Sequence, residues 1–283
     1  MIFIFAIVAI IFLLFIFIYK AHRNTHDAVF HRVEVRCSGN DQDAIRILHL
    51  SDLHLENLSI SPDYLYRKLK NEQIDLIALT GDLLDREKSI PKLVPYLEVL
   101  QKLNPAYGIY VVFGNHDYVL KEEHFQALKT MLEKHGCTVL QNEAKTISIK
   151  GKTVNVIGID DFCTGRSDLE KAYAHIKDGL HLVLTHDPNI VLHMRHYHFD
   201  YLLSGHFHGG QIHWPKPYHL VKMGKLVRMN IIKGYHELDG KPFYISEGLG
   251  QTGVNIRIGT KPEITLHTLS LTPLHRRETG KVV

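Results

Sequence analysis

The fold can be predicted outward from Ile74-Asp75-Leu76-Ile77-Ala78-Leu79-Thr80-Gly81-Asp82-Leu83-Leu84-Asp85. A short apolar run that is rich in β-formers and closes at Thr-Gly predicts a buried strand, whose C-terminal end delivers Asp82 into a loop. Open α/β sheets place their binding sites at that end. A carboxylate has two oxygens, so Asp82 can join two hard cations. The alternative is that Asp82 only caps a following helix.

Length and composition limit the class of protein. The 283 residues, 45% of them hydrophobic, support one large domain or two small ones. The net charge is only +3 and no Lys/Arg block stands out, so no nucleic-acid partner is implied. Cys37, Cys137 and Cys163 are odd in number and far apart, which is typical of a reducing compartment. The 21 histidines are an excess of the commonest metal ligand.

The N-terminus predicts a membrane anchor. Residues 2–19 are unbroken apolar or aromatic, and as a helix they span about 27 Å, close to the bilayer hydrocarbon thickness. Basic residues follow this run rather than precede it, which favours an uncleaved anchor over a signal peptide and keeps the remainder of the chain in the cytoplasm. We therefore expect an anchor at 1–20, a tether at 21–43 that can hold an edge strand at 32–36, a folded domain at 44–271 and a tail at 272–283.

The first two strand ends of the domain are joined through a helix. A strand at 45–50 leads to Asp52 and His54, whose spacing puts both side chains on one face if the backbone is extended. Ser61 and Pro62 predict the start of a helix through about Leu69, which leads to the strand before Asp82. The arrangement is a β-α-β unit.

A third strand end carries the most varied polar side chains. After a helix at 91–103, a strand at 108–113 runs into Asn115, His116 and Asp117. Asn115 offers a metal a neutral oxygen, His116 a proton or hydrogen bond, and Asp117 a carboxylate that could hold the other imidazole nitrogen. A polar turn explains one of these residues but not all three. A helix at 121–135 and a hairpin at 145–158 follow.

Two further strands end in histidines. The run 180–185 delivers His186, and 201–204 delivers His206 and His208 between glycines that allow close approach of backbone to an ion. Between the hairpin and these strands, Asp160-Asp161 could be ligands, but a capped turn before a helix at 168–177 is an equal interpretation. Six further histidines of this half are interpreted as surface residues: His193, His196, His198, His213, His219 and His236.

The C-terminal part is β-rich. Runs at 243–246, 254–257 and 263–269 should complete a second sheet. Residues 214–232 are basic and apolar, with Lys216, Lys222, Lys225 and Arg228 among large apolar side chains. In an anchored protein such a segment can lean on anionic lipid, and a solvated loop over the site is the alternative.

Taken in order, five blocks resemble the calcineurin-like metallophosphoesterases without a missing ligand: Asp52-x-His54, Gly81-Asp82-x-x-Asp85, Gly114-Asn115-His116-Asp117, His186 and Gly205-His206-x-His208. The resemblance covers roughly residues 45–269. It is closest to the membrane-associated bacterial phosphodiesterase branch, because residues 244–250 and 262–264 are similar too. It implies a four-layer α/β/β/α sandwich, here preceded by one transmembrane helix.

The resemblance also implies two divalent metal ions. Asp52, His54 and His208 would hold one ion, Asn115, His186 and His206 the other, and Asp82 would bridge them. Oxygen and imidazole ligands without a thiolate favour Mn²⁺, with Fe, Zn²⁺ or Mg²⁺ as alternatives. A metal-bridging hydroxide would attack phosphorus, and His116, oriented by Asp117, would assist the leaving group. Asp85 would support a ligand or the nearby backbone.

The expected function is therefore a membrane-anchored, single-pass phosphohydrolase that cleaves a phosphodiester or pyrophosphate bond. The expected partners are the lipid bilayer and a phosphoester or lipid-linked pyrophosphate. One alternative is a UDP-2,3-diacylglucosamine pyrophosphohydrolase, an activity found in the similar branch. An alternative of another class is a metal-binding scaffold without catalysis, which would need neither His116 nor Asp117.

Overall fold

Two six-stranded sheets form the centre of the protein. The computed structural model describes residues 1–35 and 43–272. In the first sheet the strand order is β1-β12-β2-β3-β4-β5, with bounds β1 Val29–Val35, β12 Glu263–Ser270, β2 Ala44–Leu50, β3 Leu76–Thr80, β4 Ile109–Val112 and β5 Cys137–Val139. In the second sheet the order is β10-β11-β9-β8-β7-β6, with bounds β10 Gly234–Leu238, β11 Lys241–Ile245, β9 Tyr201–Ser204, β8 Leu180–Leu184, β7 Lys152–Gly158 and β6 Glu143–Ile149.

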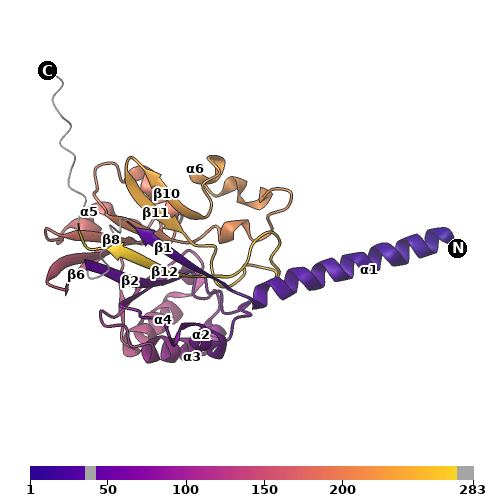
Figure 1. Ribbon diagram of the computed structural model, residues 1–283, viewed down its shortest axis with the longest axis horizontal. Coiled ribbons are helices and arrows are strands. Elements are labelled where there is room, and N and C mark those ends of the chain that lie inside the picture. Colours follow the sequence, from indigo (N-terminus) through magenta and orange to yellow (C-terminus); the bar gives the residue numbers. More distant parts are fainter. Residues whose placement is uncertain (36–42, 273–283) are drawn as a thin grey trace, which may run out of the picture.

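Helices cover the outer faces of both sheets (Figure 1). The first sheet is covered by α2 Pro62–Leu69, α3 Ile90–Lys102 and α4 Glu122–Lys134, and the second by α5 Leu169–Tyr173, α6 Lys225–Arg228 and short 3-10 helices. Between the sheets lies a separate core to which both contribute, for example Ile47 and Tyr110 from the first and Val156 and Leu182 from the second. The predicted four-layer α/β/β/α sandwich is confirmed.

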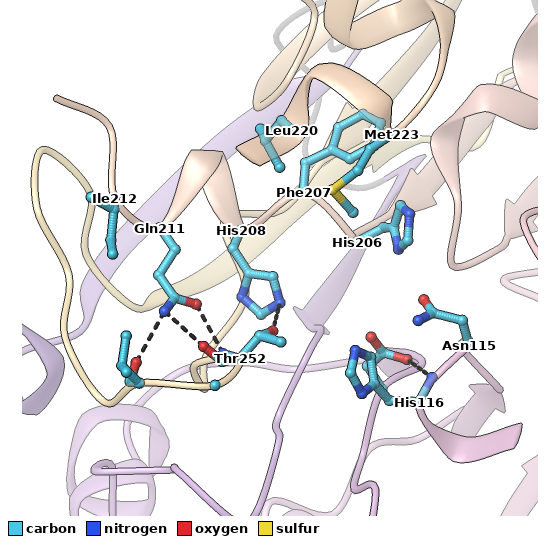
Figure 2. A pocket seen from close by; sticks show the side chains of 13 residues that line it. Asn115, His116, His206, Phe207, His208, Gln211, Ile212, Leu220, Met223 and Thr252 are labelled. Carbon is cyan, nitrogen blue, oxygen red and sulfur yellow. Dashed lines mark hydrogen bonds between the residues drawn. The ribbon is translucent and has the colours of Figure 1, made fainter. Parts of the chain in front are cut away.

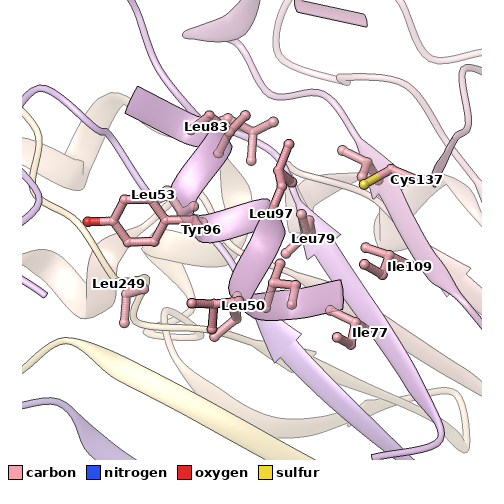
Figure 3. Close-up of a cluster of buried hydrophobic side chains, with 14 of the residues drawn as sticks. Leu50, Leu53, Ile77, Leu79, Leu83, Tyr96, Leu97, Ile109, Cys137 and Leu249 are labelled. Carbon is pink, nitrogen blue, oxygen red and sulfur yellow. The ribbon is translucent and has the colours of Figure 1, made fainter. Parts of the chain in front are cut away.

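Strand β3 shows why its sequence is a continuous apolar run. Ile77 and Leu79 point into the helix-covered core, whereas Leu76 and Ala78 point into the core between the sheets. A strand that is buried on both faces needs apolar residues at every position. The helix-covered core is drawn in Figure 3, where Leu97 of α3 packs over these strands.

Local signals explain where several elements begin and end. Ser61 caps α2 by accepting a hydrogen bond from the Tyr64 backbone N–H at 3.2 Å. Gly136 follows α4 with a φ of +74°, which glycine adopts without strain. The β6–β7 hairpin pairs in antiparallel register as predicted, and its turn residues Lys150 and Gly151 both have positive φ.

Three predicted elements differ from the structure. Strand β12 does not complete the second sheet but inserts into the first, parallel to β1 and antiparallel to β2, since alternation identifies a strand without identifying its neighbour. Residues 254–257 form a loop. Helix α5 ends at Tyr173, although Asp168 caps it as expected by accepting from the Lys171 N–H at 3.0 Å.

Helix α1 Ile2–Arg23 projects from the body of the protein (Figure 1). It is long and apolar enough to cross a membrane, and every residue from Met1 to Lys20 is exposed. Within the predicted tether, β1 joins the edge of the first sheet by pairing with β12. The remainder of that tether at 36–42, including Cys37, and the predicted tail from 273 onward lie outside the described residues.

Candidate metal centre

The polar blocks follow strands whose C-terminal ends meet at one edge of the two sheets. β2, β3 and β4 of the first sheet run parallel, as do β8 and β9 of the second. Backbone hydrogen bonds then join the loops: Asp52 N–H donates to Gly81 O at 3.0 Å, and His54 N–H to Asp82 O at 3.0 Å. This edge is where open α/β sheets bind ligands.

Several of these side chains come from a strained backbone. Asp52, His54, Asp82, His206 and His208 have φ of 51°, 40°, 51°, 75° and 51°. A positive φ is uncommon for residues other than glycine and costs about 1–3 kcal/mol each, so the surrounding structure must enforce it. The expectation that Asp52 and His54 share a face of an extended segment is therefore wrong, because both lie in left-handed turns beyond the end of β2.

Two glycines allow the loops to approach one another. A Cβ on Gly205 would overlap the side chains of Ser51 and Asp52, and a Cβ on Gly114 would overlap the Asp82 carboxylate. Any larger residue would push these loops apart. The predicted need for close backbone approach beside His206 agrees with this geometry.

One group of donor atoms consists of Asp52, His54, His208 and Asp82. His54 Nε2 lies 3.2 Å from His208 Nε2 and 3.5 Å from Asp82 Oδ2. His208 Nε2 lies 3.4 Å from Asp52 Oδ1. Two atoms that each bind one ion at about 2.1 Å are about 3.0–3.4 Å apart, so these spacings fit a shared cation.

A second group lies on the other side of Asp82. His186 Nε2 is 3.2 Å from Asp82 Oδ2 and 3.1 Å from His206 Nδ1. Asp82 Oδ2 thus faces donor atoms of both groups, which is the position of a bridging carboxylate. Asn115 lines the same cavity, and its Oδ1 is buried without a hydrogen-bond partner among the residues that the structure describes. An unpartnered buried oxygen fits a metal ligand.

The environment of His186 favours a positive charge between the two groups. Its Nδ1 lies 2.8 Å from the Thr80 carbonyl, which fixes Nδ1–H as a donor and leaves Nε2 facing Asp82. Burial alone would lower the pKa of His186, but the Asp82 carboxylate outweighs it and raises that pKa well above its ordinary value. A metal cation between His186 and Asp82 would neutralise the same Asp82 carboxylate.

The imidazoles of His54, His206 and His208 are held neutral. Burial lowers the pKa of His54 to about 4 and that of His206 to about 3, and it takes the pKa of His208 well below its ordinary value. Although burial alone would raise the pKa of Asp82, the neighbouring histidines, His186 first, hold it below its ordinary value. Neutral imidazoles around an ionised carboxylate are the protonation states that metal binding requires.

The carboxylate that faces the His116 imidazole is Asp85, not Asp117 as predicted. Asp117 accepts hydrogen bonds from the backbone N–H groups of Leu83, Leu84 and Gly114 at 2.9, 3.2 and 2.9 Å. It therefore holds two ligand loops together. The carboxylate facing His116 is Asp85, whose Oδ2 lies 3.8 Å from His116 Nδ1. Burial, followed by the charge of Asp82, raises the pKa of Asp117 to about 8.

Two further residues of this centre were not predicted as site residues. Thr252 Oγ1 lies 3.0 Å from His208 Nε2 and 3.3 Å from His54 Nε2, among the donor atoms of the first group. Arg257 is fully buried, and its guanidinium donates to five backbone carbonyls: His208, Glu247, Gly248, Gly250 and Lys261, at 2.7–3.3 Å. Both lie in the loop between β11 and β12: Thr252 belongs to none of the predicted elements, and Arg257 belongs to the predicted strand 254–257, which did not identify it as a site residue.

Replacing Arg257 tests this arrangement. We expect Arg257→Met to lower the free energy of unfolding by about 3 kcal/mol or more, because five buried carbonyls would lose a charged donor. Denaturant unfolding of the detergent-solubilised full chain measures the change. Arg67→Met, at an exposed position of α2, is the matched control. A value for Arg257→Met within about 0.5 kcal/mol of wild type, as for ordinary surface substitutions, would contradict the supporting role.

The donor atoms open into a cavity of about 370 Å³ (Figure 2). Asp82, Asn115, His116, His206 and His208 line one part of it. The remaining wall contains the apolar side chains Phe207, Ile212, Leu220, Met223 and Val254. The cavity therefore combines a charged end with an apolar wall, which suits a ligand of the same two-part character.

Of the histidines that were predicted to lie on the surface, His193, His196 and His198 are exposed, whereas His213 and His236 are half-buried. Asp160 is hydrogen-bonded to the Tyr118 hydroxyl, and Asp161 caps the following turn by accepting from the Thr164 N–H at 2.9 Å. Of the cysteines, Cys137 and Cys163 are free thiols.

Comparison with known proteins agrees with the geometry. The family model described as calcineurin-like phosphoesterase matches residues 45–210. The metallophosphoesterase YkoQ of Bacillus subtilis is 62% identical over 255 residues, which cover 89% of this chain and 94% of YkoQ.

More distant relatives carry names that specify an activity. The phosphodiesterase YaeI of Escherichia coli is 28% identical, covering 78% of this chain and 80% of its own. The UDP-2,3-diacylglucosamine pyrophosphatase LpxG of Chlamydia trachomatis is 26% identical, covering 78% of this chain and 82% of its own.

Proposed function

This chain belongs to the calcineurin-like phosphoesterase family and is a metal-dependent phosphoesterase, and we propose that it is a membrane-anchored hydrolase of a phosphodiester or pyrophosphate bond. The observation that carries the proposal is the position of Asp82 Oδ2, within 3.5 Å of His54 Nε2 and 3.2 Å of His186 Nε2. A single carboxylate oxygen between two sets of ligand atoms is the arrangement that a two-metal hydrolase uses.

We assign the ligands as two sets that share Asp82. Asp52, His54 and His208 would hold one divalent cation, and Asn115, His186 and His206 the other. The spacings of the donor atoms and the unpartnered Asn115 oxygen support this assignment. The oxygen and imidazole donors favour Mn²⁺ over thiolate-seeking ions.

Held by these residues, two such cations would supply Lewis-acid chemistry: activation of a water as the nucleophile and neutralisation of the phosphoryl oxygens. The side chains of the protein then orient the substrate and move protons. His116 lines the cavity with its side chain 26% exposed, so it can donate a proton or hydrogen bond to the leaving oxygen. Asp85 Oδ2 lies 3.8 Å from the His116 Nδ1 and faces the imidazole, and Asp117 holds the ligand loops at their spacing.

The proposal is tested with the full chain in detergent micelles. Elemental analysis should find about two divalent ions per chain, and Mn²⁺-dependent hydrolysis of a chromogenic phosphodiester should disappear after chelation. Two ions without hydrolysis of the diester or its monoester would indicate a selective cavity and make lipid pyrophosphates the next substrates. Two ions without turnover of any of these would support the scaffold alternative. Absence of bound metal would overturn the assignment.

We place the anchor at residues 1–20 and the catalytic body on the cytoplasmic side of the cell membrane. The exposed, uncharged length of α1 and the basic residues that follow it support this topology.

Deletion of residues 1–20 should release a soluble domain that keeps its metal and its activity on soluble esters. The reason is that the deleted residues are exposed, and Ala21 is the first residue of α1 that packs on the body. Size-exclusion chromatography without detergent, followed by the diester assay, measures both properties. Aggregation or loss of metal would show that residues 1–20 do more than anchor the protein.

A lipid-linked pyrophosphate is the second candidate substrate. Two observations favour it: the apolar wall of the cavity beside the proposed metal ligands, and the similarity to LpxG, a UDP-2,3-diacylglucosamine pyrophosphatase. Hydrolysis of a nucleotide-linked lipid pyrophosphate in mixed micelles, compared with the water-soluble nucleotide sugar lacking acyl chains, tests whether the apolar part is recognised.

A further inference from the structure

The C-terminal end of α1 is hydrogen-bonded to a loop that also lines the cavity. The Arg257 N–H donates to Ala21 O at 2.9 Å, and Asn24 Nδ2 donates to Arg257 O at 3.0 Å. His22 Nδ1 lies 2.9 Å from Asn255 O. Gly253 and Val254, which directly precede Asn255 in this loop, form part of the cavity wall. The helix end and the cavity therefore share one loop, residues 252–258.

This connection fixes the depth of the loop relative to a bilayer. Lys20 is the first charged side chain after the apolar run, so the hydrocarbon ends near it, and Ala21 is the next residue. Because the headgroup region extends about 5–7 Å beyond the hydrocarbon on each side, a loop bonded to Ala21 lies at headgroup level.

A second segment lies beside this loop. Ile212 pairs with Ile258 as a β-bridge, and the His213 N–H donates to Ile258 O at 2.8 Å. Figure 1 shows α6 and the neighbouring coils of this segment on the half of the body from which α1 leaves, whereas α5 lies at the opposite end. Residues 211–229 and 252–258 together form the anchor-side surface.

The anchor-side surface is both apolar and basic. Among the described residues outside α1, the exposed large apolar side chains are Trp214, Val221, Met229 and Val254 on this surface and Tyr66, Val119 and Tyr235 elsewhere. Trp214 is 72% exposed. Lys216, Lys222, Lys225 and Arg228 are exposed among them, and the sequence from Gln211 to Gly234 contains no Asp or Glu. Apolar side chains mixed with basic ones complement an anionic lipid surface.

The proposed metal ligands lie close behind this surface. Thr252 Oγ1 is within 3.3 Å of both His54 Nε2 and His208 Nε2, and Thr252 is two residues from Val254. Two residues span at most about 7 Å of chain, roughly the depth of a lipid headgroup region. A phosphate in the headgroup region could therefore reach the donor atoms while its acyl chains stay in the bilayer.

We propose that the anchor-side surface rests on the anionic leaflet that holds α1, so that the cavity opens at the lipid–water interface and takes a lipid phosphoester whose acyl part remains in the bilayer. The inference deepens the proposed function and rests on it, because α1 must be a membrane anchor. Leu220 and Met223 of the cavity wall would contact the first part of the acyl region.

The test uses Trp214, the sole tryptophan of the chain, as a native reporter. The full-length protein is placed in nanodiscs of phosphatidylcholine and phosphatidylglycerol, with or without phosphatidylcholine brominated near the top of its acyl chains. An indole at the interface should lose about half of its emission to the brominated lipid and be shielded from acrylamide. Emission that is unchanged by the brominated lipid and quenched by acrylamide would overturn the proposal, because the anchor-side surface would then not contact lipid.

Charge reversal separates the surface contact from the anchor, because α1 keeps every variant in the disc. Lys216→Glu combined with Arg228→Glu should expose Trp214 to water. The equilibrium constant for contact between the anchor-side surface and the bilayer should fall by about fivefold for each basic residue lost. Lys171→Glu combined with Lys177→Glu, at exposed positions around α5, is the matched control and should leave quenching unchanged. Equal quenching in both variants would remove the electrostatic part of the argument and overturn the anionic surface as partner.

The two proposals fail in different ways. Metal content and hydrolysis of the soluble diester report the proposed function, whereas Trp214 quenching reports the surface and needs no turnover. A fully active protein with an unquenched Trp214 contradicts only the surface. A quenched Trp214 in a protein without metal contradicts only the assigned chemistry.

Discussion

Asp82→Asn should reduce the bound metal from about two ions per chain to less than one and abolish measurable turnover of the diester. The substitution keeps the shape of the side chain but replaces the oxyanion that faces His54 and His186 with a neutral amide. The lost charge is the one that holds both ligand sets together, so neither set retains its ion. Loss of a directly binding oxygen should exceed the 10- to 100-fold cost in affinity that is typical of outer-shell changes.

Elemental analysis after gel filtration and the diester assay measure the two effects together. Asp63→Asn, an exposed position in the first turn of α2, controls for the general effect of removing a carboxylate. Circular dichroism should show the same secondary structure in both variants, because Asp82 is not needed for the pairing of β3 with its neighbours. Retention of two ions and of the wild-type rate by Asp82→Asn would refute the bridging role.

The ligand blocks could be predicted from the sequence because each one follows a strand end. Apolar runs such as 76–80 and 201–204 specify buried strands, and a polar residue directly after such a run is placed at the sheet edge by the chain itself. The structure brings together the seven residues that were predicted as ligands. Their spacing along the chain carried this information, although the backbone conformation that was expected for Asp52 and His54 did not occur.

What could not be predicted depends on contacts between distant segments. Thr252 contacts the His208 side chain and Arg257 donates to the His208 carbonyl from a loop that was predicted in part as a strand. His54, the second partner of Thr252, is 198 residues away in the chain. Strand β12 alternates as a strand should, but its place between β1 and β2 is set by three-dimensional packing. Asp117 follows His116 directly, yet the 3-10 turn that begins at Asp117 directs its carboxylate to the backbone of Leu83 and Gly114.

His116→Ala should keep about two metal ions but lose turnover by about a hundredfold or more, the usual contribution of a general acid. His116 lies next to the donor atoms but need not be a metal ligand. Its ring centre is 4.7 Å from that of His54, and its Nδ1 faces Asp85. However, His54, Asp82 and His116 also form a group that could hold a metal ion, so the alternative role as a ligand has to be tested.

The leaving group separates these two roles. If His116 protonates the leaving oxygen, the loss of rate in His116→Ala should shrink as the leaving alcohol becomes more acidic, because an acidic alcohol departs without a proton. Asp85→Asn should show the same trend more weakly, since Asp85 acts only through the imidazole. A loss of metal in His116→Ala, with equal slowing for acidic and ordinary leaving groups, would instead identify His116 as a ligand and would reassign the proton transfer to another group of the cavity.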